Sequence, residues 1–435
     1  ALLAALAARA HRHLGAIDAT ALPCEPATFT AALGAALRSA HLAGLFPVVH
    51  GLEDVVLGDA VGTDLARDVL AAHPGGLATL APPGASAPLP GGHAVIDVPM
   101  LTETQRLDVW GRALVAAGAW TRDLAALAAR FRIGPGTIHR ALASVPGDAS
   151  APCDDAIDGY LRQARGRLLG EHARRVDRLA SWSDLVLPPD VMDSLRELVG
   201  RVRHRRTVFE RWGMEAKMAT SRGLTALFQG PPGTGKTLVA GAIARELGLD
   251  LYQVDLSRVM SKWIGETERN LARIFDAADD GQAILLFDEA DSLFARRTEV
   301  RSSNDRYANL EVNYLLQRLD SFDGFAILTT NSGGSIDPAF KRRLSFQLSF
   351  PFPDEETRAA LWRAHIPREL PRAHELTFDG LARRYQLSGG YIRNACLRAA
   401  FLAAQEERPL HQDHLERAVA LEFAEQGKLS TTGAL

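Results

Sequence analysis

A glycine-rich loop at residues 230–237 carries the clearest chemistry in the sequence. It consists of Gly230, Pro231, Pro232, Gly233, Thr234, Gly235, Lys236 and Thr237. Glycines let backbone N–H groups turn inward around phosphates, a lysine reaches the outer phosphates, and a threonine hydroxyl can ligate Mg²⁺. An apolar run at 224–228 precedes the loop, and a helix-forming run that starts at Leu238 follows it. This order of strand, loop and helix predicts a triphosphate site.

Two carboxylates follow a second apolar run, at 283–287. Unbroken hydrophobicity of this length is typical of a strand buried on both faces of a parallel sheet. Acidic residues after a strand are commonly solvated turn residues, but their position downstream of the loop favours a catalytic interpretation. Asp288 would then hold Mg²⁺ through water, and Glu289 would polarise the attacking water as the general base. The expected cofactors are ATP and Mg²⁺.

The next apolar run, at 325–330, ends in Asn331, whose amide could orient the attacking water. Asparagine is otherwise an ordinary turn residue. Further along stand Arg342 and Arg343, directly after a lysine. Basic triplets are common on solvated surfaces, but a guanidinium also suits charge on a transferring phosphoryl group, especially when a neighbouring subunit supplies it. Both arginines are candidates, and which of them dominates stays open.

These motifs, in this order, resemble those of the AAA+ ATPases of the AAA clade, over about residues 181–425. The segments GPPGTGKT and LLFDEAD look like Walker A and Walker B, and Asn331 matches sensor 1. The resemblance implies that further residues lie around the nucleotide. These are Asp184, Leu185 and Val186 at the adenine, His365 near the ribose, and Gly389 and Gly390 approaching the base.

A segment between the two Walker motifs resembles the first pore loop of that family. It contains Lys262, Trp263 and Ile264, followed by a glycine. The resemblance implies a hexameric ring whose central channel is lined by these side chains and grips an extended polypeptide. A tryptophan is a large, rigid contact. The alternative is that Trp263 packs in a core, but its charged and glycine neighbours favour an exposed loop.

The resemblance implies an α/β fold, a three-layer P-loop NTPase sandwich around a parallel sheet, followed by a C-terminal helical lid. We therefore expect the large subdomain at 181–352 and the lid at 353–435. A charged segment at 151–180 is expected to be a helical linker, with a basic stripe facing a partner as the alternative. Residues 1–150 would form a separate N-terminal domain.

An internal repeat suggests what that N-terminal domain is, because residues 92–145 align with 344–400. Arg106 and Trp110 match Arg358 and Trp362 at one offset, and Gly136 and Ile138 match Gly390 and Ile392 at a slightly larger one. Upstream, His50 and Gly51 stand where Asp and Glu would be, and no phosphate-binding loop precedes them in the sequence. We expect a degenerate AAA-like domain that has lost hydrolysis.

A competing interpretation of residues 123–145 is a helix-turn-helix that binds DNA. Its second helix offers only His139 and Arg140 as base-reading candidates. Because the repeat explains the same residues, we favour the degenerate domain.

Composition sets outer limits on these interpretations. The 435 residues predict two or three domains, and 47% hydrophobic with 23% charged residues is typical of a soluble globular protein. A net charge of −3 argues against a surface built mainly for nucleic acid. No apolar run is long enough to predict a membrane span. Three scattered cysteines, Cys24, Cys153 and Cys396, predict the reducing cytoplasm, with neither a disulfide framework nor a zinc site.

The leading functional hypothesis is therefore a homo-oligomeric, hexameric ATPase that remodels, unfolds or threads protein substrates. A narrower resemblance is to the ATPases encoded with extracellular contractile injection systems, which would make components of such a machine its partners. The alternatives are a DNA-stimulated loader or translocase, and a scaffold that binds ATP without hydrolysing it. The sequence starts at Ala1 rather than at a methionine, which leaves a truncated start open.

Overall fold

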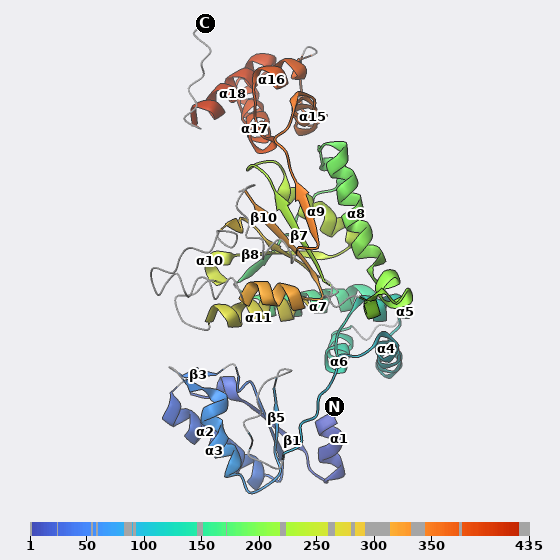
Figure 1. Ribbon diagram of the computed structural model, residues 1–435, viewed down its shortest axis with the longest axis vertical. Coiled ribbons are helices and arrows are strands. Elements are labelled where there is room, and N and C mark those ends of the chain that lie inside the picture. Colours follow the sequence, from blue (N-terminus) through green and yellow to red (C-terminus); the bar gives the residue numbers. More distant parts are fainter. Residues whose placement is uncertain are drawn as a thin grey trace. The chain divides into compact units, whose positions relative to one another are not determined.

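The computed structural model describes most of the chain and divides it into two compact units (Figure 1). The described residues are 2–23, 25–53, 55–57, 60–81, 89, 93–145, 151–170, 172–217, 223–259, 266–279, 283–291, 314–331, 344–373 and 376–425. The smaller unit comprises Ala1–Ala113 with Ile133–Arg140, and the larger comprises Leu114–Arg132 with Ala141–Leu435. None of the described helices is long and apolar enough to cross a bilayer.

The larger unit is built around a six-stranded sheet in the order β11-β7-β10-β9-β8-β6. The strands are β6 (Ala173–Arg175), β7 (Leu224–Gln229), β8 (Asp250–Val254), β9 (Ala283–Phe287), β10 (Phe325–Thr330) and β11 (Phe346–Ser349). Five of them run parallel, and only the edge strand β6 is antiparallel to its neighbour β8. The apolar runs predicted as strands are therefore β7, β9 and β10, and every residue of β9 and β10 is buried.

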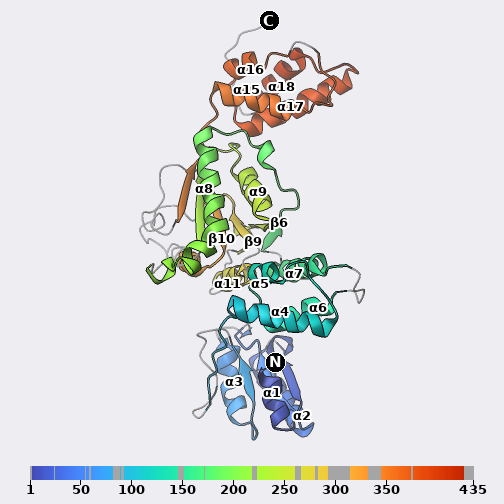
Figure 2. The same ribbon diagram turned by 90° about the vertical axis from the view of Figure 1, so that its right-hand side faces the viewer.

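Helices cover both faces of this sheet, which gives three layers (Figure 2). Alternate residues of β9 divide between the two sides: Ile284 and Leu286 pack in one core, and Leu285 and Phe287 in the other. The first core is closed by α8 (Pro189–Arg206) and α9 (Lys236–Leu247), the second by α11 (Glu266–Ala278) and a helical segment at 314–321. The short helix α10 (Leu256–Val259) adds to the second. This arrangement agrees with the predicted three-layer fold.

Four helices follow the sheet and share a core of their own. They are α15 (Glu355–His365), α16 (Phe378–Arg384), α17 (Gly389–Gln405) and α18 (Gln412–Glu425). Trp362, Ile392 and Leu415 are completely buried in that core. This bundle occupies the region expected to be the C-terminal lid.

The segment expected to be a helical linker contains more than helix. Helix α7 (Asp154–Leu169) is followed by β6, which pairs with β8 and extends the sheet by one strand. A three-residue edge strand containing two arginines has no hydrophobic pattern by which the sequence could identify it. Short turns of helix, η2 (Trp182–Asp184), η3 (Thr207–Arg211) and η4 (Met214–Lys217), lie on either side of α8 along the chain.

The smaller unit holds a three-stranded parallel sheet in the order β1-β2-β5. Its elements are α1 (Leu2–Arg9), β1 (Leu14–Asp18), η1 (Ala19–Ala21), α2 (Pro26–Leu42), β2 (Phe46–His50), β3 (Val56–Leu57), β4 (Ala60–Val61), α3 (Gly62–Ala71), β5 (Ala78–Leu80) and α6 (Pro135–Ala143). Phe29 and Leu33 of α2 pack with Val49 of β2 and Leu70 of α3 in its core. Helix α4 (Glu103–Ala117) and the end of α6 cross the division between the units, and α5 (Leu124–Arg130) belongs to the larger one.

Candidate functional site

The glycine-rich loop connects β7 to α9 at the carboxyl edge of the large sheet. Two of its glycines are required by the geometry. Gly230 has φ 155°, and a Cβ there would lie 2.2 Å from the carbonyl oxygen of Phe350. Gly233 has φ 76°, and a Cβ there would lie 2.5 Å from the Ser388 hydroxyl. The loop can therefore follow this path only with glycine at both positions.

Lys236, the first residue of α9, folds its side chain back over the loop. Its Nζ donates to the carbonyl oxygens of Gly230 (2.7 Å) and Pro231 (3.0 Å) and to Oδ1 of Asn331 (2.9 Å). Burial lowers the pKa of the lysine, and the nearby carboxylates, led by Asp288, oppose that shift. The structure thus brings the predicted lysine, at the start of α9, together with the predicted asparagine, which follows β10.

Asp288 follows β9 and accepts hydrogen bonds from three directions. The Thr237 hydroxyl lies 3.2 and 3.1 Å from its two carboxylate oxygens, Nε2 of Gln253 lies 3.0 Å away, and the Thr329 hydroxyl lies 2.5 Å away. A hydroxyl beside a carboxylate is a set of hard oxygen donors of the kind that Mg²⁺ prefers. The residues therefore fit the ion that the sequence predicts, which Thr237 would bind directly and Asp288 through water.

Thr329 also holds the residues that follow Asp288. Its hydroxyl accepts from the backbone N–H of Glu289 (3.0 Å), and its carbonyl accepts from the N–H of Ala290 (2.9 Å). Glu289 has a left-handed backbone with φ 52°, which is uncommon for a residue other than glycine. Such a conformation persists only where its surroundings hold it. These bonds therefore set the direction of an exposed glutamate side chain.

Sequence reasoning missed Thr329 and Gln253. Both are polar residues near the carboxyl ends of strands, and Thr329 is buried within a strand of otherwise mostly apolar residues. That placement is the only signal the sequence offers. A second missed contact is Asp291, whose carboxylate accepts from the Thr330 hydroxyl (2.6 Å) and from the N–H of Asn331 (3.1 Å).

The helical bundle reaches the loop through the start of α17. The N–H of Gly390 donates to the carbonyl of Gly233 at 2.9 Å. Ser388 is buried, and its hydroxyl has no hydrogen-bond partner in the described part of the chain. Gly389 and Gly390, which the resemblance places near the base, begin α17 beside the loop. His365 is half-buried, and burial, with a smaller effect of Arg393, lowers its pKa, so its imidazole is neutral near pH 7.

The chain just before the segment expected at the adenine passes close to α9. A Cβ on Gly241 would lie 3.4 Å from the backbone nitrogen of Ala180, so the two segments are nearly in contact. Asp184 is occupied as a cap, since it accepts from the N–H of Ser181 (2.7 Å), and this bond lowers its pKa. Leu185 packs against the core beneath α9, Val186 is half-buried, and Leu238 is exposed on α9.

Two groups of predicted residues lie outside the described residues. They are the pore candidates Lys262, Trp263 and Ile264 and the arginine candidates Arg342 and Arg343.

Comparison with known protein families adds a finding to this geometry. Residues 226–352 match the profile of the "ATPase family associated with various cellular activities (AAA)". The matched span includes the glycine-rich loop, the Asp288–Glu289 turn and Asn331, which the structure gathers at one edge of a parallel sheet. The protein therefore carries an AAA ATPase domain with a P-loop α/β fold and a nucleotide-binding site.

Proposed function

We propose that the protein is a Mg²⁺-dependent ATPase that works as a ring and remodels, unfolds or threads polypeptides. The observation that carries the proposal is the hydrogen-bonded cluster at the loop, in which Lys236 contacts Asn331 and Thr237 contacts Asp288. These groups come from three segments that are distant in the sequence, and chance would not place them together. A site that only bound phosphate would not need the acidic turn beside it.

Each residue of the cluster has a role in the proposed reaction. The loop amides and Lys236 would hold the phosphates of ATP. Mg²⁺, when bound at Thr237 and Asp288, would offset phosphate charge. Glu289 would accept a proton from the attacking water, and Asn331 would orient that water. The Thr329 hydroxyl would hold the Asp288 carboxylate and the Glu289 backbone in position through its two hydrogen bonds.

The ring is proposed because Arg342 and Arg343 suit a site completed by a neighbouring subunit, and AAA proteins commonly form rings. Arg343→Ala and Arg342→Ala, tested separately, should identify the dominant arginine by a loss of about 10³–10⁵ in ATP turnover. Mixing the inactive arginine variant with Glu289→Gln subunits provides the sharper test. In a ring, sites with an intact glutamate would receive an intact arginine from a Glu289→Gln neighbour, so activity should return. If mixing restores nothing, the arginines do not act between subunits.

Threading is proposed from the segment Lys262, Trp263 and Ile264, whose side chains would grip an extended chain. Trp263→Ala should abolish ATP-dependent unfolding of a fluorescent test protein while leaving basal ATP turnover within about twofold. Trp263→Tyr is the matched control, because it retains a rigid aromatic contact. Equal unfolding by the alanine variant would exclude a gripping role for this residue.

We further infer that the N-terminal unit is a degenerate AAA-like copy, and pairs of equivalent contacts support this. Arg106 donates from Nη1 to the carbonyl of Leu101 (2.6 Å), and Arg358 donates from Nη1 to that of Pro353 (2.7 Å). Both arginines are buried, and Trp110 and Trp362, four residues after each, are completely buried.

A second set of contacts repeats in the next helices. The Arg130 guanidinium lies over the Phe131 ring at 4.9 Å, and that of Arg384 lies over the Tyr385 ring at 5.3 Å. The same two arginines face acidic residues on the last helix of each set: Asp158 at 2.9 Å and Glu416 at 4.0 Å. The second pair extends the repeat beyond residue 145, into α7.

A DNA-stimulated loader or translocase is the alternative. The two short helices α5 and α6, four residues apart in the sequence, favour it because they fit a helix-turn-helix outline. Binding of duplex DNA that weakens steeply with salt, together with DNA-stimulated turnover, would support this alternative. If DNA neither binds nor stimulates, the polypeptide motor stands.

The narrower proposal is that this ATPase serves a contractile injection system in the cytoplasm, with components of that machine as its substrates. The resemblance of the SGGYIRN segment and the pairing of two AAA-like units support it. Sheath, tube and baseplate genes beside the gene for this chain are the expected finding, and an unrelated neighbourhood would remove the proposal.

A further inference from the structure

A groove lies between α7 and the edge of the large sheet. Four residues of one face of α7 line it, together with two residues of β6 and Tyr252 of β8. The α7 residues are Gly159, Arg162, Gln163 and Gly166, and the β6 residues are Ala173 and Arg175. Its volume is about 390 Å³, within the range of small-molecule sites. Strands β9 and β10 separate β8 from β7 and the glycine-rich loop, so the groove is apart from the ATP site.

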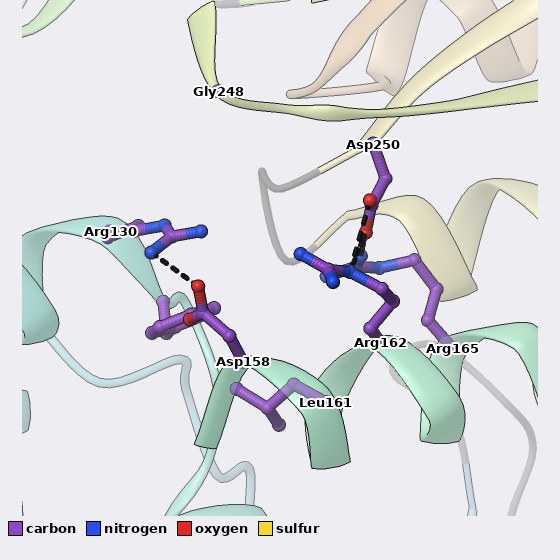
Figure 3. Close-up of a pocket in the computed structure, with 8 residues that line it drawn as sticks. Arg130, Asp158, Leu161, Arg162, Arg165, Gly248 and Asp250 are labelled. Atoms are coloured by element: carbon purple, nitrogen blue, oxygen red, sulfur yellow. Dashed lines mark hydrogen bonds and ion pairs between the residues drawn. The ribbon is translucent and has the colours of Figure 1, made fainter. Parts of the chain in front are cut away.

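The groove is positively charged. Three arginines converge on Asp250 at the start of β8: Arg162 through Nε (3.3 Å), Arg165 through Nη1 (3.0 Å) and Arg175 through Nε (3.2 Å). Figure 3 shows Arg162 and Arg165 reaching this carboxylate from α7, with the Arg130–Asp158 pair beside them. Asp177 provides a second carboxylate, 3.4 Å from Arg175. Among the residues described, three guanidinium groups thus face two carboxylates.

Several donors that line the groove are unused. Arg162 contacts Asp250 through Nε, and its two terminal nitrogens have no partner in the described part of the chain. The Tyr252 hydroxyl is buried beside the Arg165 guanidinium, which is itself a donor, and no residue described accepts the hydroxyl proton. Burial raises the pKa of this phenol, so it keeps its proton and can donate. An unsatisfied buried hydroxyl is costly, which indicates that something else accepts its hydrogen bond.

The helix leaves space for a ligand at two positions. Gly159 and Gly166 are exposed residues in the interior of α7, two turns apart and therefore on one face. Within the described chain, no heavy atom lies within 4 Å of a Cβ built on either, and neither has a positive φ. Neither crowding nor an unusual backbone conformation therefore explains the two glycines. Their presence calls for a reason, because glycine is a poor helix former. Side chains at these two positions would narrow the groove.

We propose that this groove binds the phosphate group of a small phosphorylated molecule. The terminal nitrogens of Arg162 would grip two phosphate oxygens as a fork, and the Tyr252 hydroxyl would donate to a third. Gln163, on the same wall as Arg162, supplies a further amide. The donors come from two walls, α7 and β8, which suits a tetrahedral oxyanion better than a planar carboxylate. The remaining volume would hold the rest of the molecule along the bare face of α7.

The test uses the full chain with Lys236→Ala, which weakens the phosphate contacts of the ATP site. Titration calorimetry with inorganic phosphate should show binding in this background. Tyr252→Phe removes only the hydroxyl and should lower phosphate affinity by roughly 10- to 100-fold, as expected for a hydrogen bond to a charged group. Its unfolding temperature should not fall, because the hydroxyl proton has no acceptor in the described part of the chain. Arg162→Gln should abolish phosphate binding, because it removes the guanidinium that would grip the phosphate. It should leave the edge of the sheet folded, since Arg165 and Arg175 still hold Asp250.

Two further arms locate the site and define the ligand. Gly166→Gln should block phosphate binding, because its side chain would fill the groove. It should also stabilise α7, because glutamine is a better helix former than glycine. Glycerol phosphate binding more tightly than inorganic phosphate would identify a phosphate ester as the ligand, and the reverse order would identify free phosphate. Acetate should bind far more weakly than either. Three results would overturn the proposal. They are a Lys236→Ala chain that binds no phosphate, phosphate binding that Tyr252→Phe and Arg162→Gln leave unchanged, and acetate that binds as tightly as phosphate.

Discussion

The strands β8, β9 and β10 of the large sheet and the strands β1, β2 and β5 of the small sheet have the same order and the same parallel pairing. At the carboxyl ends the two sets differ. In the large sheet, Asp288 follows β9 and bonds to Thr329 on the neighbouring strand. In the small sheet, His50 ends β2 and pairs in register with Leu80 of β5, which has no polar side chain to offer.

The polar groups of the small sheet satisfy one another locally. Asp18, at the end of β1, accepts from the hydroxyl (2.7 Å) and the N–H (3.0 Å) of Thr20, and these bonds lower the pKa of the aspartate. His50 lies 3.9 Å from the same carboxylate. Asp288 instead reaches across to Thr237 at the start of α9. A shared strand order therefore supports chemistry only where a loop and helix stand opposite the acidic residue.

The prediction with the largest expected effect is that ATP turnover depends on the large sheet and not on the small one. Glu289→Gln should lower ATP turnover by about 10²–10⁴-fold, because it removes the proposed general base while leaving nucleotide binding intact. His50→Gln, at the matching edge of the small sheet, should leave turnover unchanged. Phosphate release measured on both variants tests the comparison. Unchanged turnover in Glu289→Gln would remove this residue from the mechanism, and a large loss in His50→Gln would show that the small sheet takes part.

The buried tryptophans test whether the two helical sets that we propose to be copies of one unit contribute equally to stability. Trp362→Ala and Trp110→Ala should each lower the free energy of unfolding by about 3–5 kcal/mol, because each side chain is fully buried and leaves a cavity. Chemical denaturation followed by circular dichroism measures both. Only Trp362→Ala should also weaken ATP binding, since its bundle contacts the loop through Gly390. Loss of ATP binding in Trp110→Ala alone would contradict the proposal that only the C-terminal set serves the ATP site.

Thr329→Val probes the contact that the small sheet lacks at Leu80. Valine preserves the shape but removes the hydroxyl that Asp288 and the Glu289 N–H share, at a cost of about 1–3 kcal/mol, or roughly 5- to 150-fold in rate. We expect the loss in kcat rather than in KM, together with a higher Mg²⁺ requirement. Thr329→Ser should recover most of the rate. A valine variant with normal kcat and normal Mg²⁺ dependence would show that the hydroxyl does not position these groups.

The smallest effects concern the paired arginines of the two helical sets. Arg358→Gln and Arg106→Gln each remove a charged donor to a backbone carbonyl, so each should cost about 1.5–3 kcal/mol of stability. The measurement is the shift of the unfolding midpoint in urea. Similar shifts support two copies of one structural unit. An effect at Arg358 with none at Arg106 would show that the N-terminal contact does not stabilise its fold as the C-terminal one does.

Much of the nucleotide site was predictable because its signals are local. A glycine-rich loop between an apolar run and a helix, and polar residues directly after apolar runs, are patterns within short stretches of sequence. They singled out Lys236, Asp288, Glu289 and Asn331, which lie together at one edge of the large sheet. The edge strand β6 was not predictable, because two of its three residues are arginines and the partner of one of them, Arg175, is the distant aspartate Asp250.

The sequence by itself determined which residues can meet phosphate and which strands are buried, since both follow from residue types and their period along the chain. Only the tertiary structure decided that Thr329 and Gln253 hold Asp288, and that Gly390 bonds to Gly233. These contacts depend on β9 lying between β8 and β10, and on a helix returning to the loop from the end of the chain. The order of strands in a sheet is set by the packing of the whole domain, so no short stretch of sequence encodes it.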